Sequence, residues 1–273
     1  MWSHLIVEAI KLPVTFYKHR PFLHYWWKRA VVACGFGRTN VIILGRPSVG
    51  KTILNSHLNG EVKIDFIVPD TSTNVETKTI RMGKWTKIVR VLPGQVTNER
   101  AMGLDEAFHK HKKLEGVIYV VDWGYSVIKD KVIKEKFLIE ENIKTIAELR
   151  QRNLKSELED FTSVMNSIQE STSVGRGPKW ILIIVNKADL FISKLNEVEK
   201  YYFTDKSSPF AKILYDTINH IGKINVKCDA VPLCLWEENL EWNGEILKTE
   251  LGGEDVKQKL YANFISALYK LGK

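Results

Sequence analysis

One stretch near the start of the chain joins an apolar run to a glycine-rich loop: Val41-Ile42-Ile43-Leu44-Gly45-Arg46-Pro47-Ser48-Val49-Gly50-Lys51-Thr52. Its second part fits the pattern G-x-x-x-x-G-K-[ST] and lies between a predicted strand and a predicted helix. The glycines let backbone N–H groups turn inward around a polyphosphate, and the helix directs its positive N-terminal end at the same charge. The stretch therefore predicts a phosphate-binding loop, in which Lys51 contacts the β- and γ-phosphates and Thr52 supplies a hydroxyl to Mg²⁺.

A second motif, Asn186-Lys187-Ala188-Asp189, follows the apolar run 180–185 and concerns the base of a nucleotide. Guanine presents its N1–H and 2-amino groups as neighbouring donors, which one carboxylate, that of Asp189, can accept side by side. Adenine offers no such pair, and a buried carboxylate without donors is costly, so ATP is selected against. Lys187 can lay its stem along the purine ring, and Asn186 can tie this loop to the phosphate loop. Together the motifs predict a guanine-nucleotide site that also includes Gly45, Ser48, Val49, Gly50, Lys51, Thr52 and Ile53.

The order of the predicted elements indicates an α/β fold, because short apolar runs alternate with helical patterns. We expect strands at 41–44, 62–68, 77–82, 86–92, 116–122, 180–185 and 226–233. We expect helices at 51–58, 131–170, within 196–221 and at 256–271. The region 131–170 is long for one helix, so we expect a break near Asn153. We interpret 39–273 as one domain with a long helical insertion at about 130–175.

The order of these motifs resembles that of the Ras-like small GTPases, a family of P-loop GTPases. The resemblance covers about 39–273, and its sharp parts are 45–52, 93–95 and 186–189. It implies a P-loop G domain with a mostly parallel six-stranded sheet flanked by helices. It also implies Mg²⁺-dependent binding of GTP and GDP, slow GTP hydrolysis, and two switch segments that change protein partners with the nucleotide.

The third motif of that family, D-x-x-G, is altered in this chain. The sequence is Val91-Leu92-Pro93-Gly94-Gln95, so valine stands where the family has an aspartate that holds Mg²⁺ through water. The ion is left to Thr52, phosphate oxygens and solvent, so we expect weaker Mg²⁺ dependence or faster nucleotide exchange. Gly94 and Gln95 keep the family's places, which implies that Gly94 donates its N–H to the γ-phosphate and Gln95 orients the attacking water. A similar P-G-Q without the aspartate occurs in Ras-like bacterial polarity GTPases, so the change does not by itself imply an inactive enzyme.

Two other parts of the family's site have weak counterparts. The polar stretch 70–74 lies where the first switch is expected, and Thr73, with Thr71 as runner-up, would contact Mg²⁺ and the γ-phosphate. The S-A-K loop that backs the guanine is absent, and the nearest position is 233–235. Only backbone contacts, from Cys234 and Leu235, are carried over to it.

Two side chains allow other interpretations. Asp122 ends a predicted strand and could be the Walker B acid of an ATPase, although Asp189 argues against adenine. Arg100 could act as an arginine finger in cis, or it could be a solvated residue of the second switch.

The composition is that of a folded chain with one main core. It has 273 residues and a mass of 31.4 kDa, with 44% hydrophobic and 26% charged residues, which disfavours disorder. Three scattered cysteines are too few for a disulfide framework or a four-ligand zinc site, which fits a reducing compartment. No apolar run reaches ~18 residues and the start has no secretory pattern, so we expect a cytoplasmic protein.

The first 38 residues differ in character from the rest. The net charge of the chain is +8, and residues 1–38 hold six basic residues against one acidic residue, together with many aromatic side chains. An apolar stripe runs from Trp2 to Ile10 with helical spacing, and Pro13 should end it. This basic, aromatic arm either packs on the domain or on a partner, or lies on an anionic membrane surface.

Three functions remain open from the sequence. The first is a cytosolic switch that binds GTP and Mg²⁺, hydrolyses GTP slowly and binds effector and regulator proteins. The second is a pseudo-GTPase that holds guanine nucleotide without useful turnover and works as an interaction module. A nucleic-acid-binding GTPase ranks last, because only the positive charge favours it and no RNA-binding module is present.

The lipid interpretation of the arm predicts a difference between two chains. Vesicles with anionic headgroups should sediment the full chain more strongly than a chain that begins at Thr39, because the lysines and tryptophans of the arm supply the attraction. Equal sedimentation of both chains would contradict the lipid role.

Overall fold

Six strands form the central sheet in the computed structural model of the protein, which describes residues 40–58, 76–82, 85–95, 97–110, 114–222 and 226–272. The sheet order is β2-β3-β1-β4-β5-β6, in which β2 pairs antiparallel with β3 and the other neighbours pair parallel. The expectation of a mostly parallel sheet flanked by helices is therefore confirmed. The strands are β1 (Asn40–Leu44), β2 (Glu76–Met82), β3 (Trp85–Val91), β4 (Leu114–Val121), β5 (Trp180–Val185) and β6 (Lys227–Pro232).

The central strands form because their sequences are continuous apolar runs. Every residue of β4 and β5 is buried, as expected for parallel strands covered on both faces. The helices that cover the sheet also contact one another. His57 and Tyr261 bring α3 and α9 together with ring centroids 5.7 Å apart, while Phe161 and Phe210 stack between α6 and α8 at 3.8 Å.

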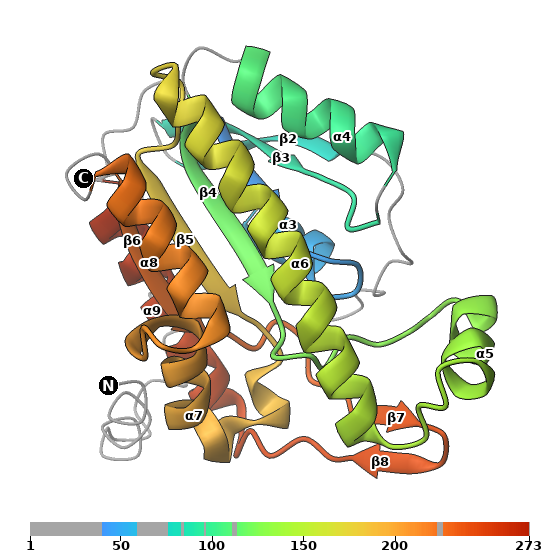
Figure 1. Cartoon of the computed structure of the whole chain (residues 1–273). Helices are drawn as coiled ribbons and strands as arrows, with labels where there is room; N and C mark the ends of the chain where they lie inside the picture. Colours follow the sequence, from blue (N-terminus) through green and yellow to red (C-terminus); the bar gives the residue numbers. More distant parts are fainter. Residues whose placement is uncertain are drawn as a thin grey trace.

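The helices lie on both faces of the sheet, with α4, α6 and α8 in front and α3 and α9 behind in the view of Figure 1. This arrangement leaves the ends of β1, β4, β5 and β6 open at one edge, where the polar loops gather. The α-helices are α3 (Lys51–Leu58), α4 (Asn98–Asp105), α5 (Lys131–Ile139), α6 (Ile146–Ser173), α7 (Leu195–Glu199), α8 (Pro209–Ile221) and α9 (Glu254–Leu271). Shorter 3₁₀ and π segments are Glu106–Lys110, Ala188–Leu190, Ile192–Lys194 and Lys200–Thr204.

The long helical insertion breaks earlier than expected. The prediction of a break near Asn153 is wrong, because α5 ends at Ile139 and α6 begins at Ile146. Thr145 caps α6, and its partner Glu148 completes a reciprocal capping box, which fixes the start of the helix. Asn153 instead lies inside α6, where its buried amide donates to the carbonyl oxygens of Gly124 and Ser126 at 3.0 and 3.3 Å.

A small hairpin that the sequence analysis did not predict joins the insertion to the domain. Strands β7 (Leu240–Trp242) and β8 (Glu245–Leu247) turn at Asn243-Gly244, both at positive φ. Trp242 packs with Phe137, Ile143 and Leu149 in a second apolar cluster, and its indole N–H donates to the carbonyl of Ile143 at 3.1 Å. The hairpin thus connects the loop after β6 to α5 and α6.

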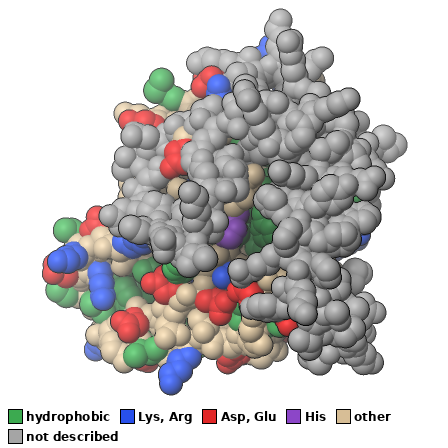
Figure 2. Space-filling view, turned by 180° about the vertical axis from the view of Figure 1, so that it is seen from behind, with side chains coloured by type: hydrophobic (Ala, Val, Ile, Leu, Met, Phe, Trp, Pro, Cys, Tyr) green, Lys and Arg blue, Asp and Glu red, His purple; other side chains and the backbone are tan. Residues whose placement is uncertain are grey.

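Several predictions lie outside the described residues. These are the arm at 1–38, the expected strand at 62–68, and the switch threonines Thr71 and Thr73. Among the described helices, none is long and apolar enough to cross a membrane. Where described residues are visible in Figure 2, acidic, basic and hydrophobic side chains are interspersed rather than sorted by charge.

Candidate functional site

The phosphate loop between β1 and α3 has the strained backbone that its glycines allow. Gly45 and Gly50 have φ of 136° and 97°, and Ser48 between them has φ of 62°. A Cβ on Gly45 would lie 2.2 Å from the carbonyl oxygen of Val120 in β4, so only glycine fits there. The loop is therefore held against the sheet, and the helix α3 begins at its end.

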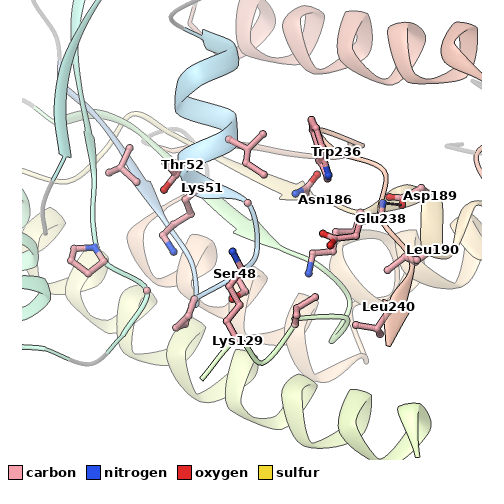
Figure 3. Close-up of a pocket in the computed structure, with 18 of the residues that line it drawn as sticks. Ser48, Lys51, Thr52, Lys129, Asn186, Asp189, Leu190, Trp236, Glu238 and Leu240 are labelled. Atoms are coloured by element: carbon pink, nitrogen blue, oxygen red, sulfur yellow. Dashed lines mark hydrogen bonds between the residues drawn. The ribbon is translucent and has the colours of Figure 1, made fainter. Parts of the chain in front are cut away.

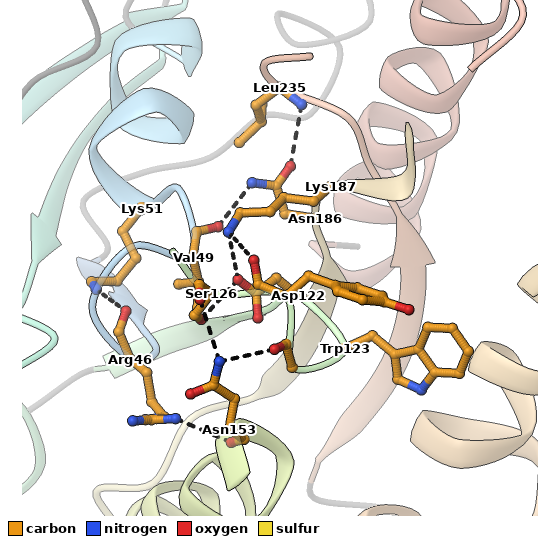
Figure 4. Close-up of polar contacts among 12 residues, drawn as sticks. Arg46, Val49, Lys51, Asp122, Trp123, Ser126, Asn153, Asn186, Lys187 and Leu235 are labelled. Carbon is orange, nitrogen blue, oxygen red and sulfur yellow. Dashed lines mark hydrogen bonds and ion pairs between the residues drawn. The ribbon is translucent and has the colours of Figure 1, made fainter. Parts of the chain in front are cut away.

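Lys51 lies in this loop with its ammonium group turned back onto the backbone. Its Nζ donates to the carbonyl oxygen of Arg46 at 2.7 Å, and the side chain is buried (Figure 4). Burial, reinforced by the nearby positive charge of Arg100, lowers the pKa of Lys51 to about 7. The loop therefore holds a desolvated cation that an anion would stabilise.

Asn186 joins the loop after β5 to two other loops. Its Nδ2 donates to the carbonyl oxygen of Val49 at 2.8 Å, and its Oδ1 accepts from the backbone N–H of Leu235 at 3.2 Å (Figure 4). The expected link to the phosphate loop is thus present. A Cβ on Gly50 would lie 2.3 Å from the same Nδ2, so the glycine leaves room for this bond.

Asp189 is buried and has few partners for a carboxylate. Its Oδ1 accepts from Sγ of Cys234 at 3.3 Å, and its Oδ2 accepts from the backbone N–H of Glu238 at 3.4 Å. Burial raises the pKa of this carboxyl group, and hydrogen bonds from Cys234, from the backbone N–H of Asp189 itself and from that of Glu238 oppose the rise only in part. Donors arriving from a ligand would stabilise its charged form.

Lys187 is held along one side of the site by charge. Its backbone is left-handed at φ 60°, and its Nζ lies 2.8 Å from Oδ2 of Asp122 and 2.7 Å from the carbonyl oxygen of Tyr125. Asp122 is fully buried, and its Oδ2 is bound within the fold to both Lys187 and Ser126. This geometry argues against the Walker B interpretation of Asp122.

One cavity of about 350 Å³ brings the separate motifs together (Figure 3). Ser48, Lys51 and Thr52 line one side, and Asn186, Asp189 and Trp236 line the other. The other predicted residues that line it are Gly50, Ile53, Gly94 and Lys187, whereas Gly45, Val49, Gln95, Cys234 and Leu235 do not. Of these five, Val49, Cys234 and Leu235 support the lining residues through the hydrogen bonds to Asn186 and Asp189.

The lining residues that were not expected from the sequence include Lys129, Trp236, Glu238 and Leu240. They lie in loops or in the short hairpin, and no periodic pattern marks them. Trp236 directly follows the loop 233–235 and is 37% exposed, so part of its ring is open to a ligand. Lys129 also lines the neighbouring hollow that contains Gln95.

Gln95 and Arg100 lie beside this cavity. Gln95 lines the neighbouring hollow together with Arg46, Pro47 and Ser48. Arg100 is only 5% exposed, so the solvated interpretation is wrong. Its guanidinium donates to the carbonyl oxygens of Gly45, Pro93 and Gly94 at 3.1–3.3 Å and pairs with Asp160 at 2.5 Å, which leaves it fixed between the two loops.

Among the described residues, few around the phosphate loop could donate to a metal ion. Thr52 lines the cavity, while Val91, also in its wall, is apolar and 3% exposed. In the described part of the chain no group of three or more His, Cys, Asp or Glu side chains could hold a metal ion. A metal ion here would bind the Thr52 hydroxyl together with nucleotide phosphate oxygens, as Mg²⁺ does in many phosphate sites.

A phosphate loop on a parallel sheet, joined through one cavity to an Asn-Lys-x-Asp loop, defines a P-loop GTPase domain. The chain belongs to the family described as 50S ribosome-binding GTPase, whose model matches residues 40–187, more than half of the chain. Family membership supports binding of GTP. Among curated protein sequences, none matches the chain.

Three solved structures are similar to the chain at low sequence identity. The small GTPase Arl6 BBS3 from Trypanosoma brucei, solved with a nucleotide analogue, is 13% identical, with 87% of this chain and 100% of that chain covered and a TM-score of 0.45. The mammalian SRP receptor is 17% identical, with coverage of 71% and 90% and a TM-score of 0.43. Toc33 from Arabidopsis thaliana, a dimerization-deficient mutant, is 13% identical, with coverage of 97% and 95% and a TM-score of 0.44.

The buried ammonium of Lys51 predicts how the stability of the ligand-free protein depends on pH. Its pKa is about 7 in the folded protein and near 10.5 in the unfolded chain, so between these values the unfolded chain binds more protons. Stability should then rise with pH. Relative to Lys51→Met, the free energy of unfolding of the wild type should gain about 1 kcal/mol per pH unit between about pH 7.5 and 9.5.

Urea unfolding at several pH values in this window measures the effect. Lys212→Met, which removes an exposed ammonium group on α8, is the matched control, and its curve should follow that of the wild type. Parallel curves for the wild type and Lys51→Met would show that Lys51 is not the source.

Proposed function

We propose that the protein binds GTP and GDP with Mg²⁺, hydrolyses GTP slowly, and acts as a switch whose protein partners depend on the nucleotide. The observation that carries the proposal is the single cavity lined by both Lys51 and Asp189. The ammonium group of Lys51 can bind a polyphosphate, and the carboxylate of Asp189 can accept from the donors on the edge of guanine. A guanine nucleotide is the ligand that needs both in one molecule.

The base would bind at the Asp189 end of the cavity. N1–H and the 2-amino group of guanine would both donate to the Asp189 carboxylate, which now accepts from the Cys234 thiol and from the backbone N–H of Glu238. Lys187, fixed by Asp122, and the part-exposed Trp236 supply the walls for the flat ring. An adenine ring has no pair of neighbouring donors to offer this buried carboxylate.

The phosphates would bind at the other end, against the backbone of the loop 45–52 and the N-terminus of α3. Lys51 would exchange its bond to the carbonyl of Arg46 for bonds to the β- and γ-phosphates. Mg²⁺ would be held by the Thr52 hydroxyl, phosphate oxygens and water, with Thr73 as a proposed further ligand. The ion supplies positive charge that neutralises the phosphate oxygens during hydrolysis.

Hydrolysis needs a water molecule in line with the γ-phosphate. We assign its orientation to Gln95 and a γ-phosphate contact to the N–H of Gly94, which lies in the cavity wall. Catalysis would then be mainly positioning, with the charge held by Lys51 and the loop N–H groups. The likeness to bacterial polarity GTPases stays a prediction.

A second candidate is a nucleotide-locked interaction module. Two observations favour it: Val91 gives the metal no oxygen, and Gln95 lines the neighbouring hollow rather than the cavity. The exposed apolar side chains Val132 and Ile139 on α5 would then form part of its working surface. A cytoplasmic location, with the arm 1–38 as the segment that reaches a partner or a membrane surface, is proposed for both candidates.

The first test concerns base selection. Asp189→Asn should lower the affinity for GDP about 100-fold, about 3 kcal/mol, because an amide cannot accept two hydrogen bonds side by side. The same variant should gain affinity for xanthine nucleotides, which carry an oxygen where guanine has its 2-amino group. Calorimetry with GDP, XDP and ADP measures both effects.

Asp205→Asn, which changes an exposed carboxylate in the loop before α8, is the matched control and should bind like the wild type. Equal affinity of the wild type for ADP and GDP, or binding of neither, would overturn the proposed function.

The second test separates the enzyme from the locked module. Multiple-turnover release of phosphate from GTP should fall at least about tenfold in Gln95→Leu, because the water loses its orienting group. Gln151→Leu, at an exposed position of α6, controls for the loss of a glutamine. Wild-type release no faster than that of Gln95→Leu, with GDP still bound, would favour the locked module.

A further inference from the structure

The carboxylate that is missing at position 91 has a neighbour on the next strand. Glu76 in β2 is the direct antiparallel partner of Val91 in β3. Residues directly opposite in an antiparallel pair point to the same face of the sheet, with Cβ atoms about 5 Å apart. Because Val91 lines the wall of the cavity, Glu76 extends on the side of the sheet that faces the phosphate loop.

The side chain of Glu76 reaches the helix that follows this loop. Its Oε2 accepts from Nδ2 of Asn55 at 3.4 Å, and Asn55 is fully buried in α3. Asn55 lies three residues after Thr52, and residues at this spacing are neighbours on one helix face, about 5–6 Å apart. The carboxylate of Glu76 therefore contacts a side chain that is a helix neighbour of Thr52, whose hydroxyl we assign to Mg²⁺.

The negative charge of Glu76 lies on the phosphate side of the sheet. Its carboxylate contacts Asn55 of α3, the helix that begins with Lys51 and Thr52. A cation bound at the start of this helix would therefore experience the charge of Glu76.

We propose that Glu76 supplies to Mg²⁺, through a water molecule on the ion, the negative charge that valine at position 91 does not provide. The inference rests on the proposed function, since it concerns the metal that accompanies the nucleotide. Mg²⁺ keeps several of its waters in such sites, so a carboxylate beyond direct contact can still hold it. Outer carboxylates of this kind typically contribute about 10–100-fold to metal affinity.

Substitutions at the two facing positions test this assignment. Glu76→Gln removes the charge but keeps an oxygen that can accept from Asn55, and Val91→Asp restores a carboxylate on the facing strand. The measurement is the release rate of a fluorescent GDP analogue as free Mg²⁺ is varied. Glu76→Gln should need about tenfold more Mg²⁺ than the wild type for half-maximal retention, and the double variant Glu76→Gln/Val91→Asp should return toward the wild-type value.

The controls separate a metal role from a structural one. Glu135→Gln, at an exposed position of α5, should leave the Mg²⁺ midpoint unchanged. Release in excess chelator and the melting temperature should be the same for Glu76→Gln and the wild type, whereas a merely structural role would change both.

Two results would overturn the inference in distinguishable ways. If the wild type retains GDP and Glu76→Gln has a Mg²⁺ midpoint within about twofold of it, the role of Glu76 is wrong and the proposed function stands. If the wild type binds no guanine nucleotide at any Mg²⁺ concentration, the role of Glu76 and the proposed function are both wrong.

Discussion

The side-chain amide of Asn186 holds together three loops that come from distant parts of the chain. It donates to the phosphate loop after β1 and accepts from the loop after β6, while its own backbone follows β5. The parallel sheet brings the ends of these strands to one edge, but it does not fix their loops relative to one another. The amide does so with two hydrogen bonds, and leaving either partner buried without it would cost about 1–3 kcal/mol.

The charges around the cavity are arranged before any ligand arrives. Lys187 and Asp122 neutralise each other at 2.8 Å, which orients the lysine stem along the wall. Lys51 and Asp189 are different, because each is desolvated and, among the described residues, is hydrogen-bonded to neutral groups. A molecule with an anion at one end and paired donors at the other would offset the desolvation of both charged groups at once. Electrostatic preorganisation of this kind makes the site selective for its ligand.

Much of the fold could be predicted from the sequence, because long apolar runs and the two motifs mark the strands and loops directly. Helix α3 begins and ends where the pattern indicates. Two features were missed although their signals are printed in the sequence. The capping box Thr145-x-x-Glu148 marks the start of α6. The pair Asn243-Gly244, between two short segments that contain apolar residues, is a strong hairpin signal.

Other parts of the site could not be predicted in this way. Lys129, Trp236 and Glu238 enter the cavity because of the paths of their loops, and these paths depend on tertiary packing. Arg100 carries no local sign that it will be buried, since its partners are carbonyl groups of two other loops and Asp160 of α6. The pairing of Glu76 with Val91 depends on strand register, which apolar runs alone leave open.

The presence of glycine at the place of Gly50 in a phosphate loop is usually explained by the need for phosphates to approach the backbone closely. In this protein Gly50 also faces the Asn186 amide, so a methyl group there would push on the base loop. The most conservative change, Gly50→Ala, would thus disturb the guanine end of the cavity as well as the phosphate end. The phosphate loop and the base loop, which would recognise the two halves of the nucleotide, touch at Gly50. A substitution in one loop at this point would therefore also affect the other.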